Sequence, residues 1–297
     1  MSSIIVNPYT FSRPLLLDSY PSPVVAYSVR RLNSSYTSSL LRVRRSSDNT
    51  EQDIGYDSNG NLDETALTNF VGAGNGFVTT WYDQSGGGYN ATMTTTTRQP
   101  RIVNGGTVEK TNNKVSLFFD GTDVFVITGI LSGFQNVAYA HMFAVAKSNL
   151  TTTAQRAIFN ASVNTSATFA RCRIGHHGSA NADMVGGRRL DADAFVQVGT
   201  SALTTNQQIF SGMIDYADAK AELFLNGTTA GSNTSFQTAG NTSNAASSTM
   251  TIGGIGTTLS PSSFWTGHIQ EVVCYSSNQN TTRIGIQENL NAYFNVY

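Results

Sequence analysis

The stretch TTWYDQSGGGYNAT, from Thr79 to Thr92, decides the fold class of this chain. Two β-forming threonines lead into Trp81 and Tyr82, and Asp83 with three glycines then ends the run. Aspartates in turns accept hydrogen bonds from backbone groups two or three residues on, and glycine readily adopts positive φ angles. The stretch therefore predicts a strand that runs into a tight turn.

Two interpretations of this turn are open. In the functional one, Trp81 and Tyr82 form an aromatic platform beside a polar turn, an arrangement that suits a sugar. In the structural one, the stretch is a buried corner in which Asp83 satisfies backbone donors. The structural interpretation is favoured, because clusters of Asp and Gly in turns usually serve backbone geometry.

The composition indicates a globular β protein. The chain has 297 residues, of which 39% are hydrophobic and only 12% charged, and its 16 Phe and 12 Tyr can fill a core. Many short apolar runs alternate with turns rich in Thr, Ser, Asn and Gly, a pattern typical of all-β proteins. The formal net charge of −1 gives no electrostatic reason to expect nucleic acid. No apolar run is long enough to span a bilayer, so membrane insertion is not expected.

The two cysteines, Cys172 and Cys274, are far apart and have no CxxC spacing. Small buried thiols are favoured over a disulfide. The first residues lack a basic segment followed by a long apolar one, so no signal peptide is expected.

Residues 1–22 are predicted to form an arm. They hold three of the chain's six prolines, and a fourth, Pro23, follows directly; prolines oppose both helix and central strand. The apolar run Leu15 to Leu17 indicates that the arm docks, either on its own domain or on a neighbouring subunit. Residues 23–297 contain no evident linker and are read as one domain.

Three local signals predict secondary structure. Asn61 is expected to cap a short surface helix that ends at Gly72. Asn226 and Gly227 predict a hairpin turn. Apolar residues at helical spacing predict an amphipathic C-terminal helix within residues 281–297.

The sequence indicates no metal site or cofactor site. His176 and His177 are adjacent, so on a strand they would point to opposite faces. The motif from Asp120 to Asp123 offers too few oxygen ligands for calcium and is read as a turn. There is no nucleophile elbow and no phosphate-binding loop.

A glycosidase needs two carboxyl groups on either side of the scissile bond. Several acidic residues lie in the central and C-terminal strands, and the sequence alone does not pair them: Asp183, Asp191, Asp193, Asp215, Glu222 and Glu271.

Five motifs carry a family resemblance, in the order AYSVRRLNSSYTSSLLRVRRSSDN, TTWYDQSGGGYNAT, LFFDGTD, AELFLNG and FWTGHIQEVVCYSSNQNTTRIGIQENLNAYF. Together they resemble the concanavalin A-like (laminin-G-like) β-sandwich superfamily. The first two are similar to the catalytic domain of the α-L-arabinofuranosidase B family, whose members carry a similar YDQSG run. The resemblance spans most of residues 24–297 and implies an all-β, two-sheet jelly-roll sandwich.

The resemblance also implies a nucleophilic Glu on a mid-chain strand and a second acid after a Gly-rich turn near the end. The corresponding stretches here, VGGRR at 185–189 and GGIGTT at 253–258, contain no acid. No catalytic residue is therefore assigned, and a non-enzymatic protein is favoured.

The proline-rich arm and the neutral, Thr/Ser/Asn-rich composition are also similar to structural proteins of tailed bacteriophages. The leading hypothesis is a virion protein of tail-fibre, receptor-binding or capsid-decoration type, made in the host cytoplasm. The arm would bind other virion subunits, the protein would form a homo-oligomer, and the sandwich would bind host-surface carbohydrate. A purely architectural protein without ligand is a further reading. The candidate glycan contacts are Trp81, Tyr82, Asp83, Tyr89, Arg188 and Trp265.

The alternative is an α-L-arabinofuranosidase-like glycoside hydrolase with a displaced catalytic pair, such as Asp191 and an acid near Glu271.

Overall fold

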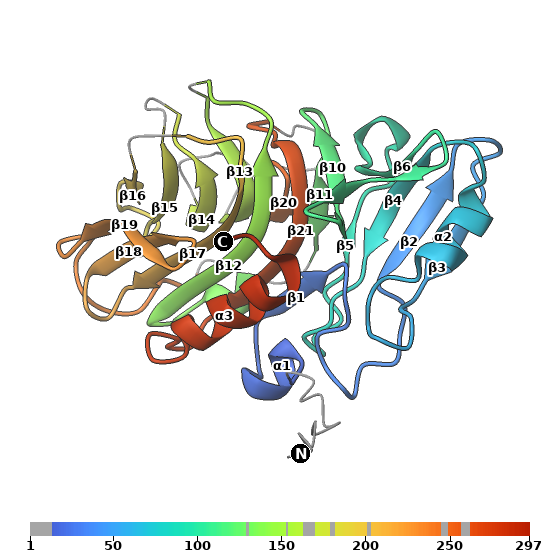
Figure 1. The fold of residues 1–297 in the computed structure, drawn as a ribbon. Helices are drawn as coiled ribbons and strands as arrows, with labels where there is room; N and C mark the ends of the chain where they lie inside the picture. The colour runs from blue at the N-terminus through green and yellow to red at the C-terminus, as the bar shows by residue number, and fades with distance from the viewer. Residues whose placement is uncertain are drawn as a thin grey trace, which may run out of the picture.

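A computed structural model describes residues 14–128, 131–152, 154–162, 170–178, 182–200, 203–244, 249–256 and 262–297. Within these ranges the chain is built almost wholly from antiparallel strands, joined by a few short helices (Figure 1). The prediction of an all-β sandwich is confirmed.

The first layer is centred on two long paired strands, β12 (Tyr139–Ser148) and β21 (Thr266–Tyr275). On its other edge, β12 pairs with β17, which continues into β18 and β19. The edge of β21 that faces away from β12 pairs with β1 along one part of its length and with β10 along another. The bounds of these strands are β17 (Gln207–Asp215), β18 (Lys220–Leu225), β19 (Thr228–Asn233), β1 (Val25–Ser28) and β10 (Leu117–Asp120).

The second layer runs in the order β16, β15, β14, β13, β20, β11 and β5. Strand β4 pairs with β5 and also with β2 and β6, so it carries this layer into the N-terminal third of the chain. The bounds are β16 (Val196–Gly199), β15 (Asp183–Gly187), β14 (Ala170–His176), β13 (Arg156–Ser162), β20 (Thr249–Ile252), β11 (Phe125–Ile127), β5 (Ala91–Thr92), β4 (Gly76–Trp81), β2 (Leu41–Arg45) and β6 (Arg101–Asn104).

The remaining elements are short. Strand β3 extends the sheet beyond β2, β7 pairs with β6, and β8 forms a separate ribbon with β9. Two 3₁₀ turns lie between strands. Their bounds are β3 (Glu51–Ile54), β7 (Thr107–Val108), β8 (Lys110–Thr111), β9 (Lys114–Val115), η1 (Thr96–Arg98) and η2 (Leu131–Phe134).

One hydrophobic core fills the space between the two layers. Alternate residues of each strand point inward, as the pleat requires, so Phe210 of the first layer and Phe159 of the second are buried between the layers. Cys172 and Cys274 are buried free thiols, as expected, and burial raises the pKa of both. Neither thiol is therefore poised as a nucleophile.

The C-terminal helix α3 (Arg283–Phe294) lies across the outer face of the first layer, against β12 and β17 (Figure 1). Ile286, Leu290 and Phe294 are fully buried beneath it. The predicted amphipathic helix is confirmed, although its last turn ends at Asn295, which adopts a left-handed conformation with a φ of 51°.

Helix α2 (Glu64–Val71) corrects the predicted cap. Its N-cap is Asp63, whose Oδ1 accepts a hydrogen bond from the N–H of Ala66 at 2.9 Å. Asn61 instead accepts a hydrogen bond from the hydroxyl of Tyr293 at 2.8 Å. The two residues are 232 positions apart, so the sequence around Asn61 does not indicate this contact. The predicted end at Gly72 is confirmed, and its φ of 67° explains the glycine.

The predicted hairpin turn at Asn226 and Gly227 is also present. It joins β18 to β19, and both residues have positive φ angles of 51° and 80°. This is the geometry of a type I′ turn, which favours Asn followed by Gly.

The C-terminal part of the predicted arm packs on its own domain. Helix α1 (Leu16–Ser19) buries Leu16 and Leu17 in the main core. Residues 1–13 lie outside the described residues, so the boundary at residue 22 and the contact with other subunits stay predictions. Among the described helices, none is long and apolar enough to cross a membrane.

Candidate active site

The turn after β4 owes its shape to Asp83. One carboxylate oxygen accepts from the N–H groups of Ala26 and Ser85, both at 2.9 Å, and the other accepts from the N–H of Tyr89 at 3.1 Å. Gly86 and Gly88 adopt positive φ angles. Asp83 is almost fully buried, so it holds the corner together in the way the structural interpretation describes.

The two aromatic residues of the stretch point in opposite directions because they are neighbours at a strand end. Trp81 is fully buried, and its indole N–H donates to the carbonyl of Ser28 at 3.1 Å. Tyr82 is half-buried and lines an open hollow. The structure therefore forms no joint Trp81–Tyr82 platform.

The other three predicted contacts lie elsewhere. Tyr89 is half-buried in a neighbouring hollow beside Ser85 and Gly87. Arg188 follows β15 and is nearly buried, with its N–H donating to the carbonyl of Ala170 at 3.0 Å. Trp265 is fully buried just before β21. The six residues predicted as glycan contacts do not form one surface.

A different group of polar side chains gathers at one end of the sandwich. His176 is the last residue of β14 and pairs in register with Asp183, the first residue of β15. Trp265 immediately precedes β21, and its ring lies against that of His176. We call these three residues, His176, Asp183 and Trp265, the end cluster.

The end cluster is closely packed around an imidazole. Nε2 of His176 lies 3.3 Å from Oδ1 of Asp183, and both side chains are 1% exposed or less. This separation is within ion-pair range, but the alignment does not meet hydrogen-bond geometry. The indole of Trp265 meets the imidazole edge-on, with ring centroids 4.6 Å apart.

Four polar atoms of the end cluster have no hydrogen-bond partner among the described residues. They are Nδ1 of His176, both carboxylate oxygens of Asp183 and Nε1 of Trp265. A buried carboxylate without donors is costly, so such groups are uncommon and call for an explanation such as a catalytic role or a bound ligand. This concentration makes the end cluster the strongest candidate site.

The chemistry available there is proton transfer beside a carboxylate. Asp183 faces Nε2 of His176, which leaves Nδ1 to take or give a proton. Every Asp, Glu and His of the sequence lies in the described ranges. Within those ranges no group of three His, Cys, Asp or Glu side chains is arranged to hold a metal ion.

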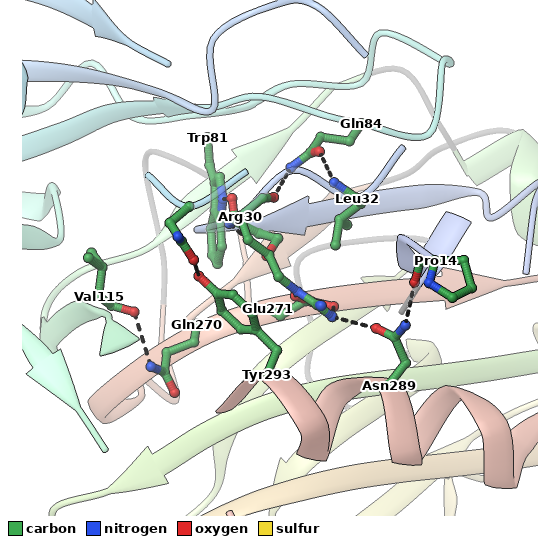
Figure 2. Close-up of polar contacts among 12 residues, drawn as sticks. Pro14, Arg30, Leu32, Trp81, Gln84, Val115, Gln270, Glu271, Asn289 and Tyr293 are labelled. Carbon is green, nitrogen blue, oxygen red and sulfur yellow. Dashed lines mark hydrogen bonds and ion pairs between the residues drawn. The ribbon is translucent and has the colours of Figure 1, made fainter. Parts of the chain in front are cut away.

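The carboxylates named for the hydrolase alternative occupy separate clusters. Asp191 contacts the guanidinium of Arg171. Glu271 receives the guanidinium of Arg30 at 2.8 and 3.1 Å and the hydroxyl of Ser28 at 2.6 Å. Figure 2 shows Arg30 between Glu271 and Asn289, so Glu271 is fully engaged in an ion pair. The structure does not pair these two acids.

The stretches that correspond to the family's acids are also filled differently. Val185 is buried in the hydrophobic core, two residues after Asp183 on the same face of β15. Ile255, in the Gly-rich stretch, is likewise fully buried, and residues 257 and 258 of that stretch lie outside the described residues. Asp183 is therefore the carboxylate that lies nearest in sequence to the expected nucleophile position on this mid-chain strand.

Sequence reasoning counted Asp183 among the available acids but did not pair it with His176. A signal was present, because the segment IGHHGSANADM places His176 and Asp183 on either side of a stretch rich in Gly, Ser and Asn, which is typical of a hairpin connection. Pairing across such a connection places His176 opposite Asp183. Trp265 could not be found in this way, because it joins the cluster from a segment far along the chain, just before β21.

Comparison with known families gives one match. The family model described as α-L-arabinofuranosidase B, catalytic, matches residues 18–287. The match includes the whole end cluster. A search of the curated proteins found no match.

Solved structures of similar fold include two arabinofuranosidases. One was determined in complex with arabinofuranosyl-α-1,2-xylobiose and is 18% identical, with a TM-score of 0.62. The other is a GH54 α-L-arabinofuranosidase soaked with a cyclic sulfate inhibitor and is 16% identical, with a TM-score of 0.60. In both cases the match covers 93% of this chain and 64% of the other. The chain thus spans slightly less than two thirds of these proteins.

These findings overturn the hypothesis of a non-enzymatic virion protein. That hypothesis rested on the composition, the arm and the missing acids, and each of these features also occurs in proteins of other classes. The family match, by contrast, extends over nearly the whole described chain. No finding supports a role in a virion, a tail fibre or capsid decoration, and the hydrolase alternative is favoured instead. With residues 18–287 matched and the sandwich in place, the chain belongs to the α-L-arabinofuranosidase B catalytic family.

Proposed function

We propose that this protein is a glycoside hydrolase that acts on α-L-arabinofuranosides, with Asp183 as the reacting carboxylate. The observation that carries the proposal is the buried Asp183 carboxylate. It has no hydrogen-bond donor among the described residues and lies 3.3 Å from His176. It begins a mid-chain strand inside the segment that the family model matches.

The reaction uses a carboxylate and an imidazole instead of two carboxyl groups. As the glycosidic C–O bond breaks, protonated His176 gives its proton to the leaving oxygen, and the Asp183 carboxylate stabilises the positive charge at the anomeric carbon. Water then adds to the anomeric carbon and returns a proton to His176. The products are a free sugar and the alcohol, and the enzyme is restored.

The substrate class follows from the family. A related structure holds arabinofuranosyl-α-1,2-xylobiose, which supports arabinofuranosyl side chains of xylan as the substrate here. Because the chain spans 64% of that protein, the substrate is a proposal for this chain alone.

The test is release of 4-nitrophenol from 4-nitrophenyl α-L-arabinofuranoside by the purified chain and three variants. Asp183→Asn is expected to lower kcat/KM at least about 100-fold, and His176→Gln a similar amount, because general acid–base groups contribute about 10²–10⁴-fold. Asp191→Asn is the matched control, since it removes the same charge from another cluster, and it is expected to keep the wild-type rate.

Melting temperatures of all variants show whether each one is folded. The proposal is refuted if the wild-type chain releases no arabinose from the aryl glycoside or from arabinoxylan. It is equally refuted if folded Asp183→Asn retains the wild-type rate.

A further inference from the structure

A second feature lies in the other half of the molecule, beside the turn that follows β4. It is a hollow of about 520 Å³, within the size range of small-ligand sites. Its walls come from the segment before β2, from β3 and from the turn after β4. Its lining residues include Tyr36, Ser38, Asp53, Tyr82 and Asn90. In Figure 1 strand β4 lies apart from β14 and β15, so this hollow and the end cluster are separate sites.

Two tyrosine rings in the hollow are held in fixed positions. The hydroxyl of Tyr36 donates to the carbonyl of Ser39 at 2.6 Å, and the hydroxyl of Tyr82 donates to Oδ1 of Asp53 at 2.7 Å. Burial raises the pKa of both phenols, so both stay neutral at physiological pH. Rings anchored at the hydroxyl offer a preorganised apolar face to a ligand, at little cost in side-chain entropy.

The polar groups around the rings are available to a ligand. Asn90 accepts from the N–H of Asp83 through Oδ1 at 3.0 Å, which fixes the amide. Its Nδ2 makes no hydrogen bond to any described residue, and neither does the exposed hydroxyl of Ser38. Asp53 is exposed and keeps acceptor capacity on Oδ2, which has only a long contact of 3.5 Å with Arg42. Donors and acceptors thus surround the two rings.

The charge of the hollow selects against anions. Asp53 and Asp83 are its charged lining residues, and Asp83 is already saturated by backbone donors. Phosphate or a carboxylate would meet these acids, whereas a neutral polyhydroxyl ligand can stack on the rings and bond to Ser38, Asp53 and Asn90.

We propose that the Tyr36–Tyr82 hollow is a second carbohydrate site, which binds a neutral sugar unit of a polysaccharide away from the end cluster. Such a site would hold a polymer on the enzyme while a side chain is hydrolysed elsewhere. The inference extends the proposed function but does not depend on it, because binding here needs no chemistry at Asp183.

The test is titration calorimetry of the full chain with arabinoxylan and arabinan oligosaccharides, together with pull-down on insoluble arabinoxylan. Tyr82→Ala and Tyr36→Ala are each expected to weaken binding about tenfold or more, because each removes a stacking face. Tyr297→Ala is the matched control, since Tyr297 is an exposed tyrosine remote from the hollow, and it is expected to bind like the wild type.

Two further variants keep the test decisive. Ser38→Arg adds bulk at an exposed rim position without removing a packed ring, so it is expected to block binding even if Tyr82→Ala proves unstable. Asp183→Asn is expected to bind polysaccharide normally, and Tyr82→Ala to hydrolyse the aryl arabinofuranoside normally. The inference is overturned if the wild-type chain binds none of the oligosaccharides, or if folded Tyr36→Ala and Ser38→Arg bind them unchanged. Loss of hydrolysis alone would count only against the proposed function.

Discussion

Arg30 and Glu271 show how burial sets the energy of a single ion pair. Their side chains are 8% and 1% exposed, and the guanidinium also contacts Asn289 and the face of the Tyr293 ring (Figure 2). A buried pair of this kind gains little net stability over an apolar pair, because both charges lose water. Removal of one partner destabilises the folded state far more, since it leaves the other charge buried without a counter-charge.

We therefore expect Glu271→Ala to lower the free energy of unfolding by about 3–5 kcal/mol in urea titrations. The double variant Arg30→Met/Glu271→Met is expected to recover most of that loss. Lys110→Ala breaks an exposed pair with Glu64 and should cost no more than about 1 kcal/mol. Equal losses for Glu271→Ala and Lys110→Ala would contradict this account.

Asp123 illustrates a pH effect of burial. It is 4% exposed, and desolvation raises the pKa of its carboxyl from 3.8 to about 7. Between those values the folded state binds more protons than the unfolded state, so the free energy of unfolding falls as pH rises from about 4 to about 7. Below pH 3.8 both states are protonated, and this contribution to stability is fully present.

Asp123→Asn is expected to flatten that decline, because an amide cannot ionise but can still accept from the N–H of Asp120, as Asp123 does at 2.9 Å. Urea titrations at several pH values from 4 to 8 would measure the effect. Parallel profiles for the wild-type chain and the variant would show that the carboxyl of Asp123 is not responsible.

At the scale of elements, helix α3 depends on one buried face. Leu290 is fully buried against the first layer, whereas Ile284, on the same helix, is 57% exposed. Leu290→Ala is expected to cost about 2–5 kcal/mol of unfolding free energy, because it removes buried methyl groups and leaves a cavity. Ile284→Ala shortens an exposed side chain and is expected to change stability by about 0.5 kcal/mol or less.

The same urea titration serves both variants. A similar loss for Ile284→Ala and Leu290→Ala would mean that α3 is held by its own helical propensity and not by contact with β12 and β17.

At the scale of the whole molecule, both layers share one core, and each layer contributes one buried cysteine to it. Cys172 belongs to β14 of the second layer and Cys274 to β21 of the first, and both thiols are fully buried. Their raised pKa values and lack of access make them unreactive in the folded protein.

We expect a chromogenic disulfide reagent to label neither thiol in the native protein. Both should become reactive over one urea range, which coincides with loss of tryptophan fluorescence. Labelling of one thiol at a lower urea concentration than the other would indicate that the two layers unfold separately.

Features encoded by neighbouring residues were predictable. Asn226 and Gly227 specify a hairpin turn because both tolerate positive φ, and Asp83 specifies a corner because its carboxylate reaches the N–H of Ser85. The spacing of Ile286, Leu290 and Phe294 predicts a helix with one apolar face. The cap of α2 could not be predicted in this way, because Asn61 and Asp63 both suit an N-cap. Only the fold decides that Asp63 accepts from the N–H of Ala66 while Asn61 accepts from Tyr293.

By itself, the sequence determined an all-β sandwich, its C-terminal helix and its resemblance to a family of arabinofuranosidases. These follow from short-range chemistry and from motifs that can be read along the chain. Only the tertiary structure decided which charged groups are buried together. His176 meets Trp265, which precedes β21 and lies 89 residues further along the chain, and Arg30 meets Glu271 across 241 residues. Such encounters depend on strand order and register, and strand order and register are set by the packing of the whole core.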